Sequence, residues 1–475
     1  MKNLIIKITL ISTVLFYLSC ESIVEDINAN PNDILITDVE DKLFLTGALL
    51  ANVQLQLGHL NRISQMYSGQ LIGFSSLYSN IYGFSLSTVE ANDEWGALYV
   101  GVLTNMKNLS SNSSNQLLVG IAQIVEAHAV GTAASLWGDI PYSEAANPEI
   151  SDPVFDNQIS VYNAAISLLD QGITTLQTAS SISLSEDIYF SGDKDKWIAA
   201  AYTLKARFNL HKKDYAAAAS AAANGISAAS GDMRFYPKES GNTTGDKNLF
   251  FTILEGSRAG DIGNSNAGVD SYLIQMLDSS TDVSRNNAKT DETARLGYYR
   301  IDSSGGSVND GVIAGTEPQN LVTYFENELI LAESKARLGS LADGLPHLNN
   351  VRAWLRDGGH LNDNHVGNAF KYDAYDASDF ASGGIENADS INAKNAFLRE
   401  VIEERYVSGF GTHMAYNDAR RLRKSDGAFA VPFILVNGPN PPYPERMPYS
   451  NNELNSNENA PNEDPGILTK TEVNR

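Results

Sequence analysis

The sequence comprises 475 residues, 43% of them hydrophobic, which is enough for a substantial core in one large domain or two to three ordinary ones. Acidic residues outnumber basic ones by 57 to 34, which gives a net charge of −23. So acidic a protein repels phosphate backbones, which argues against nucleic-acid binding, and polyanionic ligands would require a local basic patch. We therefore expect a neutral ligand.

The first 19 residues are ordered like a signal peptide, with Lys2 and Lys7 preceding a mostly apolar run at positions 8–18. That run is too short to span a bilayer, which needs about 20 residues. It ends just before Cys20 and resembles a bacterial lipoprotein signal, in which a peptidase cleaves before a lipidated cysteine. Tyr17 stands where such signals usually have Leu. An ordinary secretory leader with a chance cysteine is the alternative.

Beyond the leader, residues 20–36 are polar and interrupted by Pro31, which predicts a flexible tether between the lipid and one folded domain over 37–475. Because Cys20 is the only cysteine, that domain can form neither a disulfide nor a thiolate metal site. Its first helix is indicated by apolar residues that share one face: Phe44, Ala48, Ala51 and Leu55. The following stretch, 67–92, is rich in Gly, Ser and Tyr and too irregular for a long helix.

Apolar residues at spacings of three and four predict further helices over 116–137 and 162–176, the first ending at a Gly/Pro break. The clearest signal is a helix pair, 197–211 and 215–226, joined by a short polar turn. A second pair is expected within 322–354. Such pairs are the unit of tetratricopeptide-like repeats, so the sequence predicts a mostly α fold built as a partial solenoid.

Long irregular loops are expected between these helix pairs, at about 231–320 and 357–392. Loops of this length are usually functional or contain short elements of their own. From Pro432 onward the chain is rich in Pro and Asn, and its end is expected to be poorly ordered.

Catalytic motifs are absent from the sequence, including phosphate-binding Gly runs, nucleophile elbows and zinc-binding His-Glu-x-x-His. His128 and His211 fall on or beside apolar helix faces, as packed core histidines do. Two loops contain residues spaced like possible cation ligands: His360 and His365, and Asp373, Asp376 and Asp379. Calcium requires more carboxylates at defined positions, so solvated loops are the expectation. We predict no enzymatic activity, no metal and no cofactor.

Aromatic residues are unusually frequent in the expected loops, and five are candidate ligand contacts: Tyr78, Tyr82, Trp95, Tyr298 and Tyr299. Aromatic faces stack on the C–H faces of sugar rings, while neighbouring Asn, Asp and Arg bond the hydroxyls. The group therefore suits carbohydrate or peptide binding. For any single residue, filling a gap in a loop-rich core is the alternative.

Several short motifs together resemble the SusD/RagB family of nutrient-binding outer-membrane lipoproteins. In chain order they are residues 26–32, Trp95 with Tyr99 and Asn105, 136–145 (LWGDIPYSEA), 333–339, 350–352, 403–405, Asp418 with Arg420 and Arg421, and 446–449 with Glu453 and Asn457. The chain departs from the family's usual pattern after Arg405, where Tyr406-Val407 and Phe410-Gly411-Thr412 stand. This indicates a divergent branch.

The resemblance implies a tetratricopeptide-like helical scaffold whose long loops carry the ligand site. It also implies an outer-membrane lipoprotein, facing the exterior, that captures a neutral oligosaccharide. As the lid of a TonB-dependent, SusC-like transporter, it would deliver that ligand without chemistry. On the same basis Asp139, Pro141 and Tyr142 pack the scaffold. Arg420 and Arg421 pair with buried acids such as Glu404.

Trp95 is the motif residue nearest a ligand position of the family, so Trp95→Ala is expected to weaken binding and leave the fold intact. Three alternatives remain. The protein could bind peptide instead of glycan, be a structural lipoprotein of an outer-membrane assembly, or be a lipid-anchored hydrolase. For the hydrolase, the 57 acidic residues offer many carboxylate pairs, and nothing in the sequence singles one out.

Overall fold

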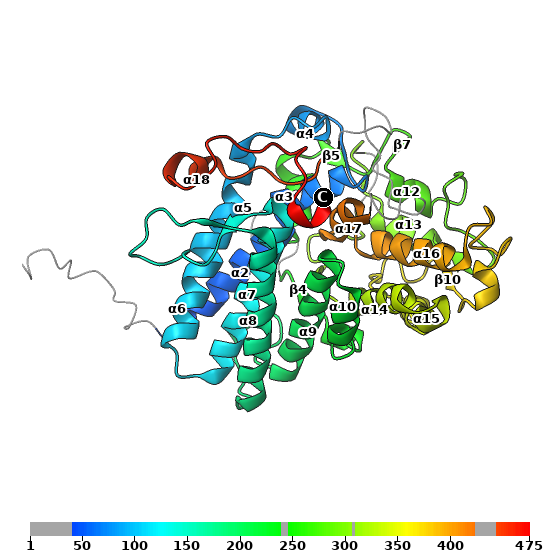
Figure 1. The fold of residues 1–475 in the computed structure, drawn as a ribbon. Helices are drawn as coiled ribbons and strands as arrows, with labels where there is room; N and C mark the ends of the chain where they lie inside the picture. Colours follow the sequence, from blue (N-terminus) through cyan, green and yellow to red (C-terminus); the bar gives the residue numbers. More distant parts are fainter. Residues whose placement is uncertain (1–39, 239–245, 306–308, 423–442) are drawn as a thin grey trace, which may run out of the picture. The chain divides into compact units, whose positions relative to one another are not determined.

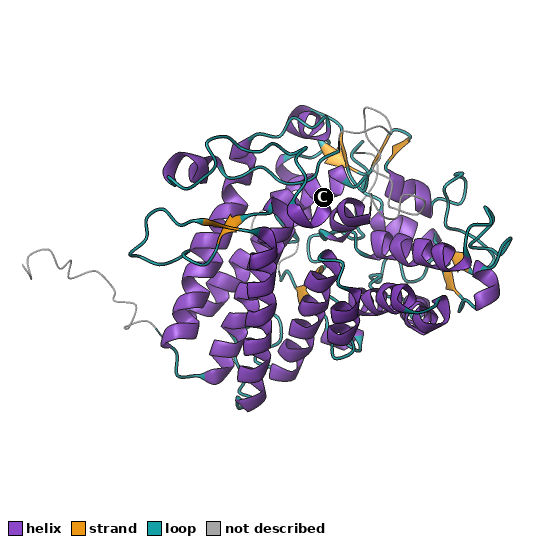
Figure 2. Ribbon diagram, in the orientation of Figure 1, coloured by secondary structure: helices purple, strands orange, loops and turns teal. Residues whose placement is uncertain are grey.

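The computed structural model describes residues 40–238, 246–305, 309–422 and 443–475. The chain divides into two units, Met1–Leu43 and Phe44–Arg475, and the fold below is that of the second. Helices dominate it, and its strands form short two-stranded pairs (Figure 2). The mostly α fold predicted from the sequence is confirmed. The expected leader, the tether at 20–36 and Cys20 lie outside the described residues.

A row of packed helices forms the scaffold (Figure 1). In order they are α7 (Gln116–Trp137), α8 (Gln158–Thr178), α9 (Lys194–His211), α10 (Tyr215–Ala222), α14 (Tyr324–Leu338) and α15 (Leu341–Arg356). Each packs on the next, and α9–α10 and α14–α15 are the two helix pairs predicted from the sequence. Only α10 is shorter than predicted. It ends at Ala222, and the buried Ile226 lies beyond it, where its N–H donates to Thr203 Oγ1 at 3.0 Å.

Polar caps determine where these helices begin. The residue before each helix accepts a hydrogen bond from a backbone N–H of the first turn in α7, α8, α9, α10 and α14, and these caps are Asn115, Asn157, Asp193, Asp214 and Thr323. Ser340 and Asp343 form a capping box at α15. Such caps satisfy N–H groups that have no partner within the helix.

Close packing of α7 against its neighbours depends on glycine. A Cβ added to Gly120 would lie 2.6 Å from the Leu176 side chain and 3.3 Å from the carbonyl oxygen of Gly172 on α8. A Cβ on Gly131 would lie 2.1 Å from the Phe208 ring of α9. Packed interiors do not absorb such overlaps, so a side chain at Gly131 would force the Phe208 ring to move.

Helix α7 is apolar and long enough to cross a membrane, with 22 residues, but 94% of its apolar window is buried inside the fold. The stretch Leu43–Tyr67 passes the same test and is 56% buried. The apolar character of α7 is therefore explained by its central position in the core.

The N-terminal helices cover the other side of α7. They are α2 (Leu43–Leu57), α3 (His59–Tyr67), α4 (Ser76–Tyr82), η2 (Thr88–Ala91), α5 (Asn92–Gly96), the π-helix η3 (Ala97–Leu103) and α6 (Thr104–Asn112). Asn52 of α2 bonds His128 at 3.2 Å, and Thr132 donates to Gln56 at 3.1 Å, so buried polar contacts fix α2 on α7. His128 is the core histidine that the sequence predicted.

Two long insertions interrupt the scaffold, as expected, and both contain short elements. The first lies between α10 and α14, where β4 (Met233–Phe235) pairs antiparallel with β9 (Gln319–Val322). It contains η4 (Ala229–Gly231), α11 (Leu249–Phe251), the π-helix η5 (Thr252–Ser257), β5 (Ile262–Gly263), β6 (Ser265–Asn266), β7 (Val269–Asp270), α12 (Tyr272–Leu277), β8 (Thr290–Asp291) and α13 (Thr293–Tyr299). The second, after α15, contains β10 (Lys371–Tyr372) and η6 (Ala377–Phe380).

Buried ion pairs tie α16 (Ala393–Ser408) to α14 and to α17 (Met414–Leu422). Arg405 of α16 donates to Asp418 of α17 at 2.6 Å and also to Glu333 of α14. Arg421 donates to the same two carboxylates, at 2.8 and 2.6 Å. All four side chains are at most 5% exposed, so two cations and two anions neutralise each other inside the core.

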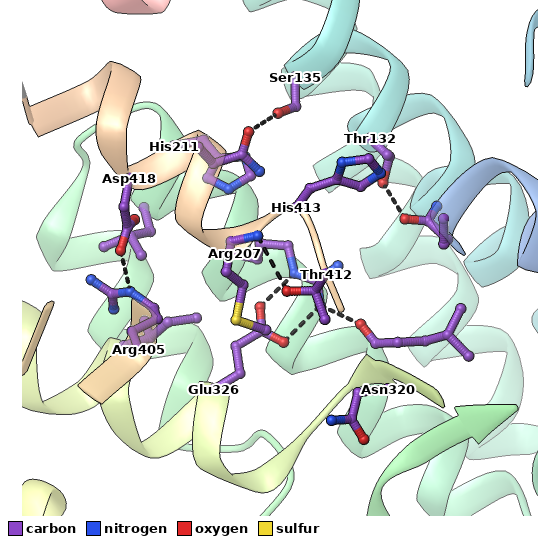
Figure 3. Close-up of a pocket in the computed structure, with 16 residues that line it drawn as sticks. Thr132, Ser135, Arg207, His211, Asn320, Glu326, Arg405, Thr412, His413 and Asp418 are labelled. Carbon is purple, nitrogen blue, oxygen red and sulfur yellow. Dashed lines mark hydrogen bonds and ion pairs between the residues drawn. The ribbon is translucent and has the colours of Figure 1, made fainter. Parts of the chain in front are cut away.

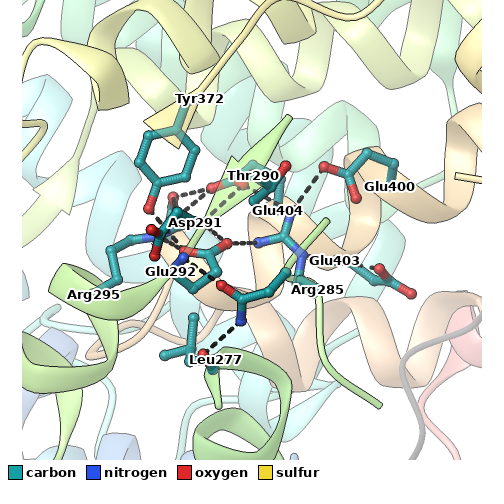
Figure 4. Close-up of polar contacts among 12 residues, drawn as sticks. Leu277, Arg285, Thr290, Asp291, Glu292, Arg295, Tyr372, Glu400, Glu403 and Glu404 are labelled. Carbon is teal, nitrogen blue, oxygen red and sulfur yellow. Dashed lines mark hydrogen bonds and ion pairs between the residues drawn. The ribbon is translucent and has the colours of Figure 1, made fainter. Parts of the chain in front are cut away.

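A second buried network links α16 to the first insertion (Figure 4). Glu404 accepts from Arg295 at 2.7 Å and from Arg285 at 2.9 Å, and Glu292 pairs with both arginines. Burial alone would raise the pKa of Glu404, but Arg295 and Arg285 hold it well below its ordinary value. Tyr372 of β10 donates to Glu292 at 2.8 Å, so the second insertion joins the same network.

These networks confirm that Arg421 pairs with buried acids, but they correct the expectation that Glu404 is the partner and that Arg420 also pairs with an acid. Glu404 pairs with arginines of the insertion, whereas Arg421 pairs with Glu333 and Asp418. Arg420 donates to the Ser135 carbonyl at 2.8 Å and to Asn417. Residues close in sequence therefore face different partners.

The segment 443–475 is packed, so the expectation of a poorly ordered end is wrong for these residues. It contains α18 (Asn451–Ser456) and η7 (Glu472–Asn474). Met447 N donates to the Leu136 carbonyl, and Trp137 Nε1 donates to the Pro448 carbonyl, both at 2.8 Å. The end of α7 is also where β2 (Ile140–Pro141) and β3 (Phe155–Asp156) pair.

Trp95 joins α5 to this segment. Its indole N–H donates to Glu453 Oε2 at 3.2 Å, and its ring centroid lies 5.1 Å from that of Trp137 and 5.9 Å from that of Tyr449. The side chain is only 5% exposed. Trp95 is therefore part of the core.

Removing Arg405 should be costly. Arg405→Ala would leave Glu333 and Asp418 with fewer positive partners in the core, and we expect a loss of about 3 kcal/mol or more in the free energy of unfolding. The matched control on the same helix is Arg399→Ala, because Arg399 pairs with the half-exposed Asp389. That change should cost under about 1 kcal/mol. Urea unfolding checks both, and equal losses would contradict the assigned importance of Arg405.

Trp95→Ala should destabilise the fold, in contrast to the expectation from sequence alone. Truncating a buried Trp leaves a large cavity and costs about 3–5 kcal/mol. Tyr236→Ala is the control, because Tyr236 is 49% exposed, and should change stability by about 0.5 kcal/mol or less. A shift in the urea midpoint for Trp95→Ala alone is the expected result, and wild-type stability of that variant would refute it.

Candidate functional site

A polar cavity of about 40 Å³ lies between α7, α9, α14 and the start of α17 (Figure 3). Arg207 forms two hydrogen bonds to Glu326 across it, one of them 2.6 Å long. His413 Nε2 and Asn320 Oδ1, which also line it, have no hydrogen-bond partner in the part of the chain that the structure describes. Such a volume holds a few waters and no sugar ring. The cavity is therefore a polar part of the core.

The histidines around this cavity are neutral. Burial, together with the charge of Arg420, lowers the pKa of His413 to about 3. Burial and nearby Arg207 also hold the pKa of His128 and of His211 well below the ordinary value. His211 Nδ1 shares a hydrogen bond with the Tyr162 hydroxyl, and the two atoms are 3.3 Å apart. It is thus a hydrogen-bonded core histidine, as the sequence predicted.

Four of the five aromatic residues expected at a ligand site are buried. Trp95 is 5% exposed, Tyr78 2%, Tyr298 3% and Tyr299 8%. Tyr78 accepts from Arg62 at 3.3 Å, and Tyr298 donates to Glu317 at 2.8 Å. In this conformation these rings offer no open face on which a sugar could stack. Their geometry matches the alternative weighed above, that they fill a loop-rich core.

Tyr82, the fifth, is only partly buried, and so is Tyr272. Both interact with the buried Tyr406. The rings of Tyr272 and Tyr406 are 6.0 Å apart at 68°, and both Tyr272 and Tyr82 add electrostatically to the burial that raises the pKa of Tyr406. Glu403, whose side chain is 33% exposed, adds to the burial that raises the pKa of Tyr272 to about 12. We call Tyr82, Tyr272 and Glu403 the tyrosine surface.

Three separate parts of the chain position the tyrosine surface. Tyr82 ends α4, which packs on β1 (Ile72–Gly73), and β1 pairs with β5 of the first insertion. Tyr272 begins α12, and its N–H donates to the Gly69 carbonyl at 3.1 Å. Glu403 is on α16, where the neighbouring Tyr406 donates to the Ser68 carbonyl at 3.0 Å. Backbone contacts thus hold both tyrosines in place.

The chemistry of this surface suits a carbohydrate. Partly exposed tyrosine rings present apolar faces for sugar C–H groups, and their hydroxyls donate and accept hydrogen bonds. Partial burial, with the charge of Glu386, raises the pKa of Glu403 to about 7 against the opposing effect of Arg285. Glu403 can then accept from a sugar hydroxyl when ionised and donate to one when protonated.

The loop residues considered as cation ligands are engaged with protein groups. His360 contacts Asp232 at 2.9 Å, and His365 contacts Asp310 at 3.1 Å. Asp376 and Asp379 share Lys289, at 3.2 and 2.6 Å. Among the residues that the structure describes, no group of three or more His, Cys, Asp or Glu is arranged to hold a metal ion.

Tyr272 was not singled out from the sequence. It lies within the predicted loop at 231–320, and the signal that could have found it is local: Ser271 before it is a helix cap. An aromatic residue at the first position of a capped helix is held by the backbone and can remain partly exposed. The β1–β5 pairing and the hydrogen bond from Tyr272 N to the Gly69 carbonyl bring this part of the first insertion against the segment that precedes α4.

Comparison with known proteins agrees with this architecture. Residues 33–345 match a SusD-like family model described as "Starch-binding associating with outer membrane". No curated protein matches the chain. Solved structures that it resembles include a SusD/RagB family protein from Bacteroides thetaiotaomicron, with a TM-score of 0.65 and 21% identity over 89% of this chain and 95% of that one.

Two further structures have similar folds. A SusD homolog from Bacteroides fragilis has a TM-score of 0.65 and 16% identity, covering 92% of this chain and 100% of that one. A chitin-binding SusD homolog from Flavobacterium johnsoniae has a TM-score of 0.63 and 15% identity, covering 91% and 98%. At these identities the likeness concerns the fold, whereas the family model covers about two thirds of the chain. This chain belongs to the SusD-like family.

Proposed function

We propose that this protein is a surface lipoprotein of the outer membrane that captures a nutrient oligosaccharide. The observation that carries the proposal is the match over residues 33–345 to a family described as starch-binding and associated with the outer membrane. A chitin-binding protein among the structures of similar fold also supports a glycan ligand. The tyrosine surface is the place where we propose that glycan contact occurs.

The remaining parts of the proposal follow from the sequence. Cys20 carries the acyl chains that anchor the protein in the outer membrane. Several chains, including palmitate, give stable attachment where one chain would give only marginal binding. Residues 20–36 provide the slack for a lid on a TonB-dependent, SusC-like transporter. The protein hands the ligand to that transporter and does not hydrolyse it.

A neutral glycan is favoured over a polyanion because the chain carries a net charge of −23. A peptide ligand and a lipid-anchored hydrolase are the competing functions. Retention of a glycan without release of reducing sugar supports the proposal. Release of reducing sugar would favour the hydrolase, and retention of peptides alone would favour peptide uptake.

Binding should depend on the two partly exposed tyrosines. We expect Tyr82→Ala and Tyr272→Ala each to weaken the affinity for the retained glycan about tenfold, because each removes a ring at the centre of the contact. Titration calorimetry with maltoheptaose and chitohexaose, chosen after screening on starch and chitin, measures the affinities.

Tyr236→Ala is the matched control for this experiment. Tyr236 is 49% exposed, follows β4, and is not part of the tyrosine surface. That variant should bind as the wild type does. Wild-type affinity in both Tyr82→Ala and Tyr272→Ala, with glycan still bound, would place the binding site elsewhere.

Cys20→Ala should separate ligand affinity from uptake. We expect the purified variant to bind glycan with unchanged affinity, since position 20 precedes the folded domain. Uptake of the same glycan by cells carrying the variant should be abolished, because the protein is no longer held beside its transporter. Mass spectrometry checks that the variant carries no lipid. Normal uptake by cells with this unlipidated protein would show that contact with the transporter is enough to hold the protein in place.

A further inference from the structure

A hollow of about 320 Å³ opens beside the C-terminal segment, within the size range of small-ligand sites. Its lining includes Arg446, Tyr449, Lys470, Glu472, Asp139 and Pro465. None of these belongs to the tyrosine surface. Arg446 and Tyr449 are buried in its wall, whereas Lys470 is exposed at its rim.

Arg446 is one of the buried arginines of the described residues that form no ion pair. Arg420 is another, but it donates to the Ser135 and Glu445 carbonyls and to Asn417. Arg285, Arg295, Arg405 and Arg421 each form ion pairs with two or more carboxylates. Arg446 is equally buried, at 5% exposure, but no carboxylate of the described residues lies within 4.0 Å of it. Leaving a buried cation without a counter-charge is costly.

The donors of Arg446 are also little used. Its Nε donates to the Met447 carbonyl at a long 3.3 Å, and its buried Nη2 has no hydrogen-bond partner among the described residues. The guanidinium lies over the Tyr449 ring, 4.2 Å from the centroid, which orients it. A guanidinium with free donors is suited to the two oxygens of a carboxylate.

Acidic residues in the lining are committed to other partners. Asp139 accepts from Gln158 N at 2.8 Å, and Glu472 accepts from the Asn157 side chain. Lys470 has no ion-pair partner among the described residues, and Arg475 adds another cationic side chain to the lining. The lining therefore carries three basic and two acidic side chains, which makes it more positive than the chain as a whole, whose net charge is −23.

We propose that the hollow binds the carboxylate of a uronic acid residue, with Arg446 as its main partner and Lys470 as a second. The lining also offers what the sugar ring needs. Pro461 and Pro465 present apolar surface, and Thr469 presents a hydroxyl. This is a second site for an acidic sugar, and it stands whether or not the tyrosine surface binds a neutral glycan.

Methyl β-D-glucuronide and methyl β-D-glucoside test the proposal, since they differ in the carboxylate. Titration calorimetry with the full folded domain should give binding of the glucuronide at least tenfold tighter than of the glucoside. Equal binding of both, or no binding of the glucuronide, would overturn the proposal. Acetate binding as tightly as the glucuronide would also overturn it, because the site would then recognise a free carboxylate and no sugar.

Two variants assign the residues. Arg446→Gln should weaken glucuronide binding about tenfold or more, as expected when one partner of an enclosed charge pair is removed. Because Arg446 is buried, Lys470→Ala provides a second test at an exposed position. It should weaken binding roughly two- to fivefold and lower its salt dependence.

Lys371→Ala is the control, since Lys371 is 48% exposed and outside the hollow. It should bind the glucuronide as the wild type does. Tyr272→Ala should also retain glucuronide binding, which separates failure of this site from failure of the tyrosine surface. If Arg446→Gln is folded, and both it and Lys470→Ala bind the glucuronide as the wild type does, the assignment is overturned.

Discussion

The fold depends on two neighbouring residues of α16 whose side chains form separate ion-pair networks. Glu404 holds Arg285 and Arg295 of the first insertion. Arg405 holds Glu333 of α14 and Asp418 of α17. All these charges are buried, and each is stable there only because the opposite charge is present at contact distance. One turn of helix thus joins the scaffold to the loops that it carries.

The tyrosine surface is a consequence of this junction. Glu403 and Tyr406 belong to the same turn as Glu404 and Arg405. The ion pairs that fix α16 therefore also fix Tyr406, with which Tyr82 and Tyr272 interact. The tyrosine surface is assembled from α4, α12 and α16, and the buried networks hold α16 in place.

Aromatic residues in the long loops serve mainly as a core for the loops themselves. The ring centroids of Tyr298 and Tyr299 are 5.1 Å apart, and those of Tyr299 and Phe410 are 5.6 Å apart. These rings therefore pack the first insertion against the segment between α16 and α17. A loop of this length must bury apolar surface of its own to stay ordered. Arg446 has no counter-charge among the described residues, in contrast to Arg285, Arg295, Arg405 and Arg421.

Most of the helical scaffold could be predicted from the sequence. Helix α7 coincides with the predicted residues 116–137, and α9, α14 and α15 begin at local caps, because helical periodicity and capping involve residues three or four positions apart. Membership of the SusD-like family was also readable from short motifs. Which loop aromatics are buried, and which acid each arginine meets, depends on the tertiary structure. Trp95 bonds Glu453, 358 positions away, and Tyr272 N bonds the carbonyl of the distant Gly69, and such contacts depend on the whole path of the chain.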